Sequence, residues 1–248
     1  MSKDQVTDQA HAIAFGAHPD DVELSVGGTV LLLRAKGYEV AIVDATRGEL
    51  GTRGTPEVRA EEASEAARRL NVSHRINLEL PDGNLRATDE ARKKVVETIR
   101  RFRPAIVLAP RPDDLHPDHA HLGVLVREAA FLSGVRKFGS GGAPHRPRAV
   151  LQYASHTQFT PSLVVDVSEH FAAKKHAALA YKSQFFDPAS SEPATYISSA
   201  RFWDWWEARA RHYGNLVGAT HGEPFLVEAP LLVKDPVAQF LDFGYYPG

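Results

Sequence analysis

The chain contains the same short arrangement twice: an apolar run of strand length, followed by a His-Pro-Asp motif. Residues 12–15 precede His18-Pro19-Asp20-Asp21, and residues 105–109 precede His116-Pro117-Asp118-His119. Open α/β sheets bind their ligands beyond the carboxyl ends of the strands. If these two strands are parallel neighbours, both motifs lie at the same rim of the sheet. The repeat therefore predicts an α/β fold with a functional site between the two strands.

His18, Asp21 and His119 are the candidate metal ligands at this rim. Two imidazoles and one carboxylate leave coordination positions open, which is typical of a catalytic rather than a structural metal. We expect Zn²⁺, and Fe²⁺ or another divalent ion suits the same donors. The chain has no cysteine, so thiolate ligands, disulfides and Cys nucleophiles are excluded.

A purely structural explanation competes with this one. Pro is favoured at the first position of a helix, and Asp near a helix start interacts well with the helix dipole. One His-Pro-Asp motif could therefore be a helix cap. Two such motifs, both after apolar runs and together supplying three ligands, favour a metal site.

The other polar residues of the motifs suggest hydrolysis of an amide at the metal. Asp20, next to the ligand Asp21, is the candidate general base, which takes a proton from water and passes it to the leaving amine. His116, one helical turn before His119, can stabilise the oxyanion if it is protonated. Asp118 is expected to orient His116 or to favour its charge.

Composition limits the classes of protein that the chain can belong to. With 248 residues and 43% hydrophobic content, it can form one α/β domain with a substantial core. The net charge of -2 gives no basic surface for nucleic acid, so we expect no nucleic-acid partner. Residues 1–5 carry charged and polar side chains where a signal peptide would need an apolar core, and no apolar run reaches the length of a membrane span. We therefore expect a cytoplasmic protein without a membrane partner.

The pattern of apolar residues and turn signals predicts alternating strands and helices. No Gly-x-Gly-x-x-Gly fingerprint follows the first strand, which argues against a nicotinamide cofactor. Strands are expected at residues 12–15, 40–43, 76–80, 105–109, 150–153, 163–167 and 225–227. Helices are expected at 24–36, 56–70 and 89–102, after His119, from Ser168 to Tyr181, and around Trp203, Trp205 and Trp206.

Several further residues have both a structural and a functional interpretation. Arg59 is either a solvated helix residue or a substrate contact, and Asp82 is either a turn residue or an acceptor for sugar hydroxyls. Of the histidines outside the motifs, His156 and His221 are the candidates for the pocket. The Gly-rich loop at 139–142 is a candidate lid or linker, and the tryptophan cluster is expected in the core or in a subunit contact.

Together the two motifs resemble the LmbE-like, or PIG-L, family of zinc-dependent N-acetylglucosaminyl deacetylases. The likeness runs from about Ile13 to Phe186 and includes residues 46–49, Arg59, 80–82 and 179–185. The last stretch, with residues 165–167, is similar to the branch that deacetylates N-acetylglucosaminyl malate in bacillithiol biosynthesis.

This resemblance implies a Rossmann-like, mostly parallel sheet flanked by helices, without a nucleotide and with a small C-terminal extension. We expect a single deacetylase domain over residues 1–248, with a core at about 12–135 and C-terminal strands and helices at about 149–248. Related proteins form hexamers or other oligomers. The resemblance therefore also implies a homo-oligomer, for which a hexamer is one candidate.

The resemblance also implies roles for individual residues toward a small-molecule N-acetylglucosaminide. Zinc is expected on His18, Asp21 and His119, and Arg59 with Asp82 is expected to hold the sugar. Arg53 is a candidate partner for a malate carboxylate, whereas Asp20 and His116 have the catalytic roles given above.

Three alternatives stay open at this point. Another N-acetyl sugar, such as diacetylchitobiose or a mycothiol-type precursor, could be the substrate of the same site. Two His and one carboxylate also describe a non-haem Fe(II) oxygenase. A protein of another class, which binds an N-acetyl sugar through the metal without hydrolysing it, is the third.

Overall fold

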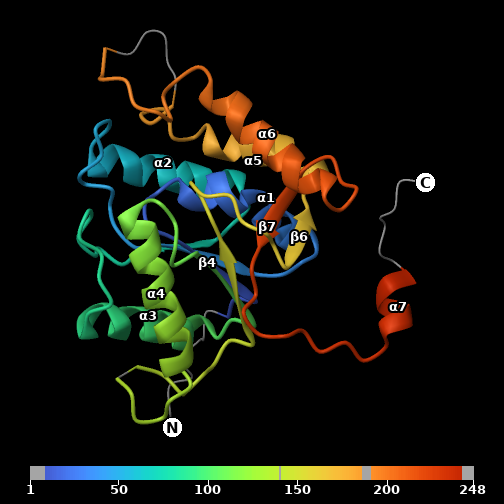
Figure 1. The fold of residues 1–248 in the computed structure, drawn as a ribbon. Helices are drawn as coiled ribbons and strands as arrows, with labels where there is room; N and C mark the ends of the chain where they lie inside the picture. The colour runs from blue at the N-terminus through green and yellow to red at the C-terminus, as the bar shows by residue number, and fades with distance from the viewer. Residues whose placement is uncertain (1–8, 140, 186–190, 242–248) are drawn as a thin grey trace.

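A five-stranded parallel sheet with the strand order β3-β2-β1-β4-β5 forms the centre of the molecule (Figure 1). The computed structural model describes residues 9–139, 141–185 and 191–241; residues 1–5 and Phe186 lie outside them. The strands β1 and β4 are neighbours, with Ala12 opposite Ile106. The predicted α/β fold is therefore confirmed. The strands are β1 (Ala12–Gly16), β2 (Val40–Asp44), β3 (His74–Asn77), β4 (Ile106–Pro110) and β5 (Ala149–Tyr153).

Helices cover both faces of this sheet (Figure 1). One face carries α1 (Asp21–Ala35), with α2 (Pro56–Arg69) and α5 (Phe171–Ala178) beside it. The other face carries α3 (Asp89–Phe102) and α4 (Pro117–Leu132). Every residue of β1 and β2 is consequently buried, which explains why these strands are continuous apolar runs in the sequence.

The C-terminal part adds a small antiparallel sheet and further helices. These elements are β6 (Leu163–Asp166), a 3-10 turn (Ser168–His170), α6 (Phe202–Asn215), β7 (Gly222–Phe225) and α7 (Pro236–Leu241). Figure 1 shows α7 on an extended arm away from the rest of the fold. No helix in the described part of the chain is long and apolar enough to cross a membrane.

Several predicted boundaries in the C-terminal part are wrong. The strand β5 belongs to the main sheet, although it follows residue 135 in the sequence. The helix predicted from Ser168 begins at Phe171, because the Ser168 hydroxyl donates to Asp166 Oδ1 in a local turn. The last strand lies at Gly222–Phe225 rather than 225–227, and α7 was not predicted.

The third strand is also displaced from its predicted position at 76–80. Leu78 and Leu80 are buried and their amides donate to the carbonyls of Asp44 and Ala45, so the alternating pattern does reflect burial. Glu79, however, has a φ of 53°, which takes the backbone out of the extended conformation. The ladder therefore ends at Asn77.

Ser140 of the Gly-rich loop at 139–142 lies outside the described residues, and Gly141 and Gly142 do not lie over the site. Gly141 packs against Glu97, and Gly142 packs against Arg100, in the last turns of α3. These turns lead into the start of β4, at the end of the sheet opposite the two motifs. The lid hypothesis is therefore wrong.

The helix α3 offers a direct test of local stability. The Thr88 hydroxyl accepts a hydrogen bond from the Ala91 amide at 3.2 Å and caps the helix. We expect Thr88→Ala to lower the free energy of unfolding by about 1 kcal/mol, measured by urea denaturation. Thr160→Ala, at an exposed position, serves as the control. Equal effects of both substitutions would contradict the capping role.

Candidate metal centre and active site

The two His-Pro-Asp motifs meet at the carboxyl ends of β1 and β4. This is the point where the strand order changes direction, and open α/β sheets form their binding crevice there. A cavity of about 340 Å³ opens at this position. Its walls include the side chains of His18, Asp20, Asp21, His116 and His119.

Asp21 lies between the imidazoles of His18 and His119. Its Oδ2 atom is 3.5 Å from His18 Nδ1 and 3.2 Å from His119 Nε2. One potential ligand atom from each residue lies within 4.8 Å of those of the other two. Asp21 and His119 are buried, and His18 is half-buried. The structure thus brings together the three predicted ligands.

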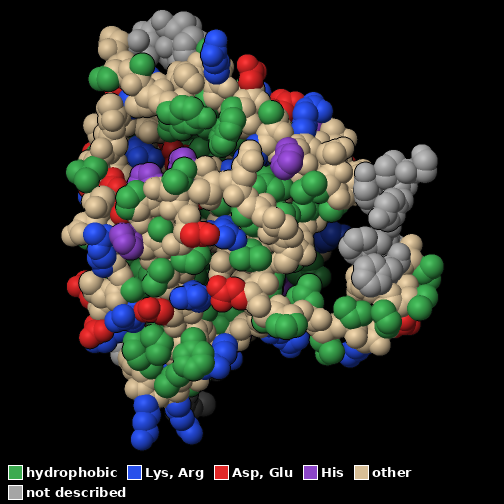
Figure 2. Space-filling model, viewed as in Figure 1, with side chains coloured by type: hydrophobic (Ala, Val, Ile, Leu, Met, Phe, Trp, Pro, Cys, Tyr) green, Lys and Arg blue, Asp and Glu red, His purple; other side chains and the backbone are tan. Residues whose placement is uncertain are grey.

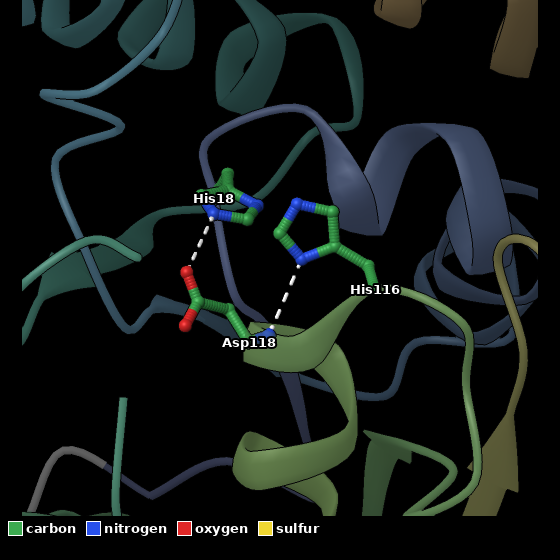
Figure 3. A group of neighbouring side chains, drawn as sticks. All are labelled: His18, His116 and Asp118. Atoms are coloured by element: carbon green, nitrogen blue, oxygen red, sulfur yellow. Dashed lines mark hydrogen bonds and ion pairs between the residues drawn. The ribbon is translucent and has the colours of Figure 1, made fainter. Parts of the chain in front are cut away.

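The outer nitrogens of the two imidazoles face carboxylates. His18 Nε2 is 3.1 Å from Asp82 Oδ1 and 3.5 Å from Asp118 Oδ2, the latter shown in Figure 3. His119 Nδ1 is buried and makes no hydrogen bond to any described residue. The Asp114 Oδ1 atom lies 3.7 Å from it, within the distance of an ion pair. Metal-ligating histidines usually direct their outer N–H at such carboxylates, so these contacts fit a metal site.

The charge balance of the site also fits a cation. Burial disfavours a charged His18, but the carboxylates of Asp118, Asp21 and Asp82 outweigh burial and raise its pKa well above the usual value. Burial opposes ionisation of Asp21, yet His119 and His18 hold the pKa of Asp21 well below its usual value. The site therefore has an excess of negative charge from its carboxylates. A divalent cation would compensate this charge, as a proton on His18 does.

Two overlapping groups of residues could also hold an ion: His18 with His116 and Asp118, and His119 with Asp114 and His156. In each, the carboxylate accepts at least two backbone hydrogen bonds, whereas Asp21 accepts one among the described residues, from the His18 amide. Asp118 accepts from Gly83 and Leu85, and Asp114 accepts from His116 and Ser155. Asp114 and Asp118 are thus better suited to hold loops and histidines in place.

Asp20 occupies a strained backbone position at the start of α1. Its φ of 115° is unusual for a residue other than Gly, and such strain occurs often at functional sites. The side chain is buried, and burial raises its pKa to about 7 against the opposing charge of Arg59. Arg59 Nη2 donates to Asp20 Oδ2 at 3.2 Å and to the Pro19 carbonyl at 2.5 Å. Asp20 is thus a carboxylate poised for proton exchange near neutral pH.

His116 and Asp118 are arranged differently from the prediction. The Asp118 amide donates to His116 Nδ1 at 3.2 Å, whereas the Asp118 carboxylate is directed at His18 (Figure 3). Burial and the neighbouring His119 and His18 lower the pKa of His116. Because Nδ1 accepts a hydrogen bond, a neutral ring carries its proton on Nε2. His116 is therefore suited to act as a neutral N–H donor, because the Asp118 carboxylate raises its pKa by less than burial and the two neighbouring histidines lower it.

The remaining predicted residues are distributed unevenly around the pocket. Arg59, Asp82 and His156 line it, and Arg59 is buried rather than solvated. Arg53 lies outside the lining, where its guanidinium donates to Glu192 and to the Phe185 carbonyl. His221 also lies outside and stacks on Phe171, with ring centroids 3.9 Å apart.

Asp114 is the site residue that the sequence interpretation missed. Its carboxylate reaches His119 and His156 and holds the loop after β5 through the Ser155 amide. The pair Asp113-Asp114 directly after β4, on the same rim as the motifs, was the available signal. Asp113, in contrast, is exposed and pairs with Arg111.

We expect Asp114→Asn to weaken metal binding about 10- to 100-fold, because the His119 ring loses its carboxylate partner. Competition with a chromophoric chelator measures the affinity. Asp113→Asn is the matched control and should leave the affinity unchanged. Unaltered metal affinity in a folded Asp114→Asn protein would show that Asp114 does not position His119.

Comparisons with known proteins agree with this geometry. The PIG-L family model, described as GlcNAc-PI de-N-acetylase, matches residues 13–130. A diacetylchitobiose deacetylase of Thermococcus kodakarensis is 33% identical over 226 residues, which cover 83% of this chain and 78% of the relative.

Two solved structures share the fold over most of their length. The conserved protein TT1542 of Thermus thermophilus aligns with a TM-score of 0.83 at 36% identity, covering 92% of this chain and 98% of that one. The N,N'-diacetylchitobiose deacetylase of Pyrococcus horikoshii aligns with a TM-score of 0.75 at 26% identity, covering 88% and 84%. Sequence, fold and site together show that the chain belongs to the PIG-L family of deacetylases.

Proposed function

We propose that this chain removes the acetyl group from an N-acetylglucosaminide with one divalent metal, Zn²⁺ in the first instance, on His18, Asp21 and His119. The observation that carries the proposal is the placement of Asp20, a buried carboxylate with a pKa of about 7, beside these three residues. A bound divalent ion would polarise the acetamide carbonyl and acidify a water molecule.

The chain's own residues supply the proton transfers and the charge stabilisation. Asp20 accepts a proton from the attacking water and delivers it to the amine nitrogen as the C–N bond breaks, while Arg59 holds its Oδ2 atom. The Nε2–H of His116 donates to the oxygen of the acetyl group as negative charge develops there. Asp82, at the pocket wall, can accept hydrogen bonds from sugar hydroxyls.

The candidate substrates differ in the aglycone attached to the N-acetylglucosamine. The resemblance of residues 165–167 and 179–185 to the bacillithiol branch favours N-acetylglucosaminyl malate, whereas the Thermococcus relative acts on diacetylchitobiose. Arg53, the expected partner of a malate carboxylate, is paired with Glu192 outside the pocket, which weakens the support for malate. The cytoplasmic location and the homo-oligomer stay predictions.

An assay of both products tests the proposed function. Metal-loaded protein is incubated with free N-acetylglucosamine, di-N-acetylchitobiose and N-acetylglucosaminyl malate, and acetate and free amine are measured together. We expect the two products in equal amounts from at least one substrate. Tight binding of a sugar that stays acetylated would instead support the non-catalytic sugar-binding protein. Dioxygen consumption with a 2-oxo acid would support the oxygenase.

A further inference from the structure

The pocket has an apolar, aromatic group of lining residues that the proposed chemistry does not use. Tyr196, Ile197, Phe202 and Trp205 come from the first turn of α6 and the segment before it. Figure 2 shows hydrophobic side chains gathered on this face near α6, beside a hollow in which histidine side chains are visible. These residues lie on the same cavity as the metal ligands, so they can contact the substrate.

Tyr196 and Trp205 present aromatic surface that packing does not cover. Tyr196 is 60% exposed, which is high for so large an apolar ring, and Trp205 is half-buried. Phe202, only 4% exposed, supports both rings, with centroids 6.0 Å from Tyr196 and 6.3 Å from Trp205. A buried ring behind two accessible rings forms a rigid surface for a ligand.

This aromatic surface is fixed relative to the metal ligands. The next residue of α6, Trp206, is buried, and its Nε1–H donates to the Leu24 carbonyl at 2.8 Å. Leu24 lies in the first turns of α1, three residues after Asp21. A substrate whose acetamide lies at the ligands can therefore reach the rings without a rearrangement of the fold.

The Lys and Arg side chains of the pocket lining, which could receive a carboxylate, are engaged in other contacts. Among the described residues that line the pocket, Arg59 and Arg209 are the only Lys or Arg. Arg59 donates to Pro19 and Asp20, and Arg209 donates to the carbonyls of Ala154 and Ser155. A dicarboxylate would also meet the negative charge of Asp20 and Asp82. Away from the metal ligands, the described pocket lining therefore offers an aglycone carboxylate no Lys or Arg side chain without hydrogen-bond partners, which favours a neutral aglycone.

Substrate chemistry connects these observations. The acetamide of N-acetylglucosamine is on C2 and the aglycone is on the adjacent C1, so both must fit in one cavity. A pyranose ring exposes C–H groups on its faces, which pack on aromatic rings, and its hydroxyls point outward to water. We infer that Tyr196 and Trp205 form a subsite for a neutral sugar ring at the aglycone position. This inference rests on the proposed deacetylase function.

The test compares kcat/KM for three substrates: di-N-acetylchitobiose, N-acetylglucosaminyl malate and free N-acetylglucosamine. We expect the wild type to prefer the disaccharide over the malate conjugate by at least about tenfold. Tyr196→Ala and Trp205→Ala should each lower kcat/KM for the disaccharide by about 3- to 30-fold, mainly through KM. Turnover of free N-acetylglucosamine should change less than about twofold, because it lacks the second ring.

Two control variants separate stacking from loss of structure. Trp205→Phe keeps an aromatic face and should retain most of the disaccharide turnover. Tyr38→Ala removes an exposed ring outside the pocket lining and should change nothing. Preference for the malate conjugate, or equal losses on all three substrates, would overturn the subsite alone. Absence of acetate from every substrate with the metal-loaded wild type would overturn the proposed function and the subsite together.

Discussion

Asp20→Asn is expected to lower kcat for N-deacetylation by about 10³-fold, because the amide can neither accept the proton of the attacking water nor deliver it to the amine. Asn has nearly the same size as Asp and tolerates positive φ well, so the backbone at φ 115° should be preserved. Metal content should stay at one ion per chain, since Asp20 is not among the three ligands. Steady-state acetate release and metal analysis of the same sample measure both quantities.

The exposed Asp113 provides the matched control for Asp20. Asp113→Asn removes a carboxylate that pairs with Arg111 and should leave kcat unchanged. Two results would contradict the role of Asp20. One is a kcat within tenfold of the wild type in Asp20→Asn, and the other is loss of the metal together with the activity.

The second large effect is expected at the metal ligands. His119→Ala should lower the metal retained after dialysis from one ion per chain to less than about a tenth, and turnover by more than about 10³-fold. His119 is 1% exposed and its Nε2 lies 3.2 Å from Asp21 Oδ2, so its removal leaves His18 and Asp21 without the third ligand of the predicted set. Metal analysis and acetate release provide the two readouts.

His121→Ala is the control for this substitution, because it changes another histidine of α4 whose side chain contacts Arg86. It should retain both the ion and the activity. Full metal occupancy in His119→Ala would place the ion in another group, namely His18 with His116 and Asp118. Melting temperatures of both variants show whether the fold is kept.

The convergence of the two motifs could be predicted because it depends only on strand direction. Each motif follows its strand directly, and parallel neighbours end at the same rim of the sheet. Once β1 and β4 pair, His18, Asp21 and His119 must lie close together. The cap of α3 at Thr88 likewise depends only on residues near the start of the helix, so the sequence is sufficient to predict it.

Contacts that depend on loops could not be predicted in the same way. Asp82 reaches His18 from 64 residues along the chain, and Arg59 reaches Asp20 from 39 residues. Their sequence patterns, a turn and a helix start, are satisfied by local structure alone. Only the packing of the loops over β1 decides that both side chains lie at the site.

Proximity in sequence was misleading for Asp118. His116 is the N-cap of α4, and its Nδ1 accepts a hydrogen bond from the Asp118 amide, so the Asp118 backbone rather than its carboxylate makes this contact. The carboxylate accepts from the Gly83 and Leu85 amides instead and faces His18. The aromatic subsite could not be predicted from the sequence for a related reason. Trp205 and Trp206 are adjacent in sequence, yet tertiary packing of α6 buries one and leaves the other half-exposed.

Titration of the metal-stripped protein with Zn²⁺, followed by acetate release, tests the central claim most directly. We predict no release without metal, a linear rise on addition of Zn²⁺, and a plateau at one ion per chain. Under the same titration, Asp20→Asn should bind the ion without releasing acetate. Acetate release at the full rate by the metal-free protein, or a plateau reached only at two ions per chain, would contradict a single metal on His18, Asp21 and His119.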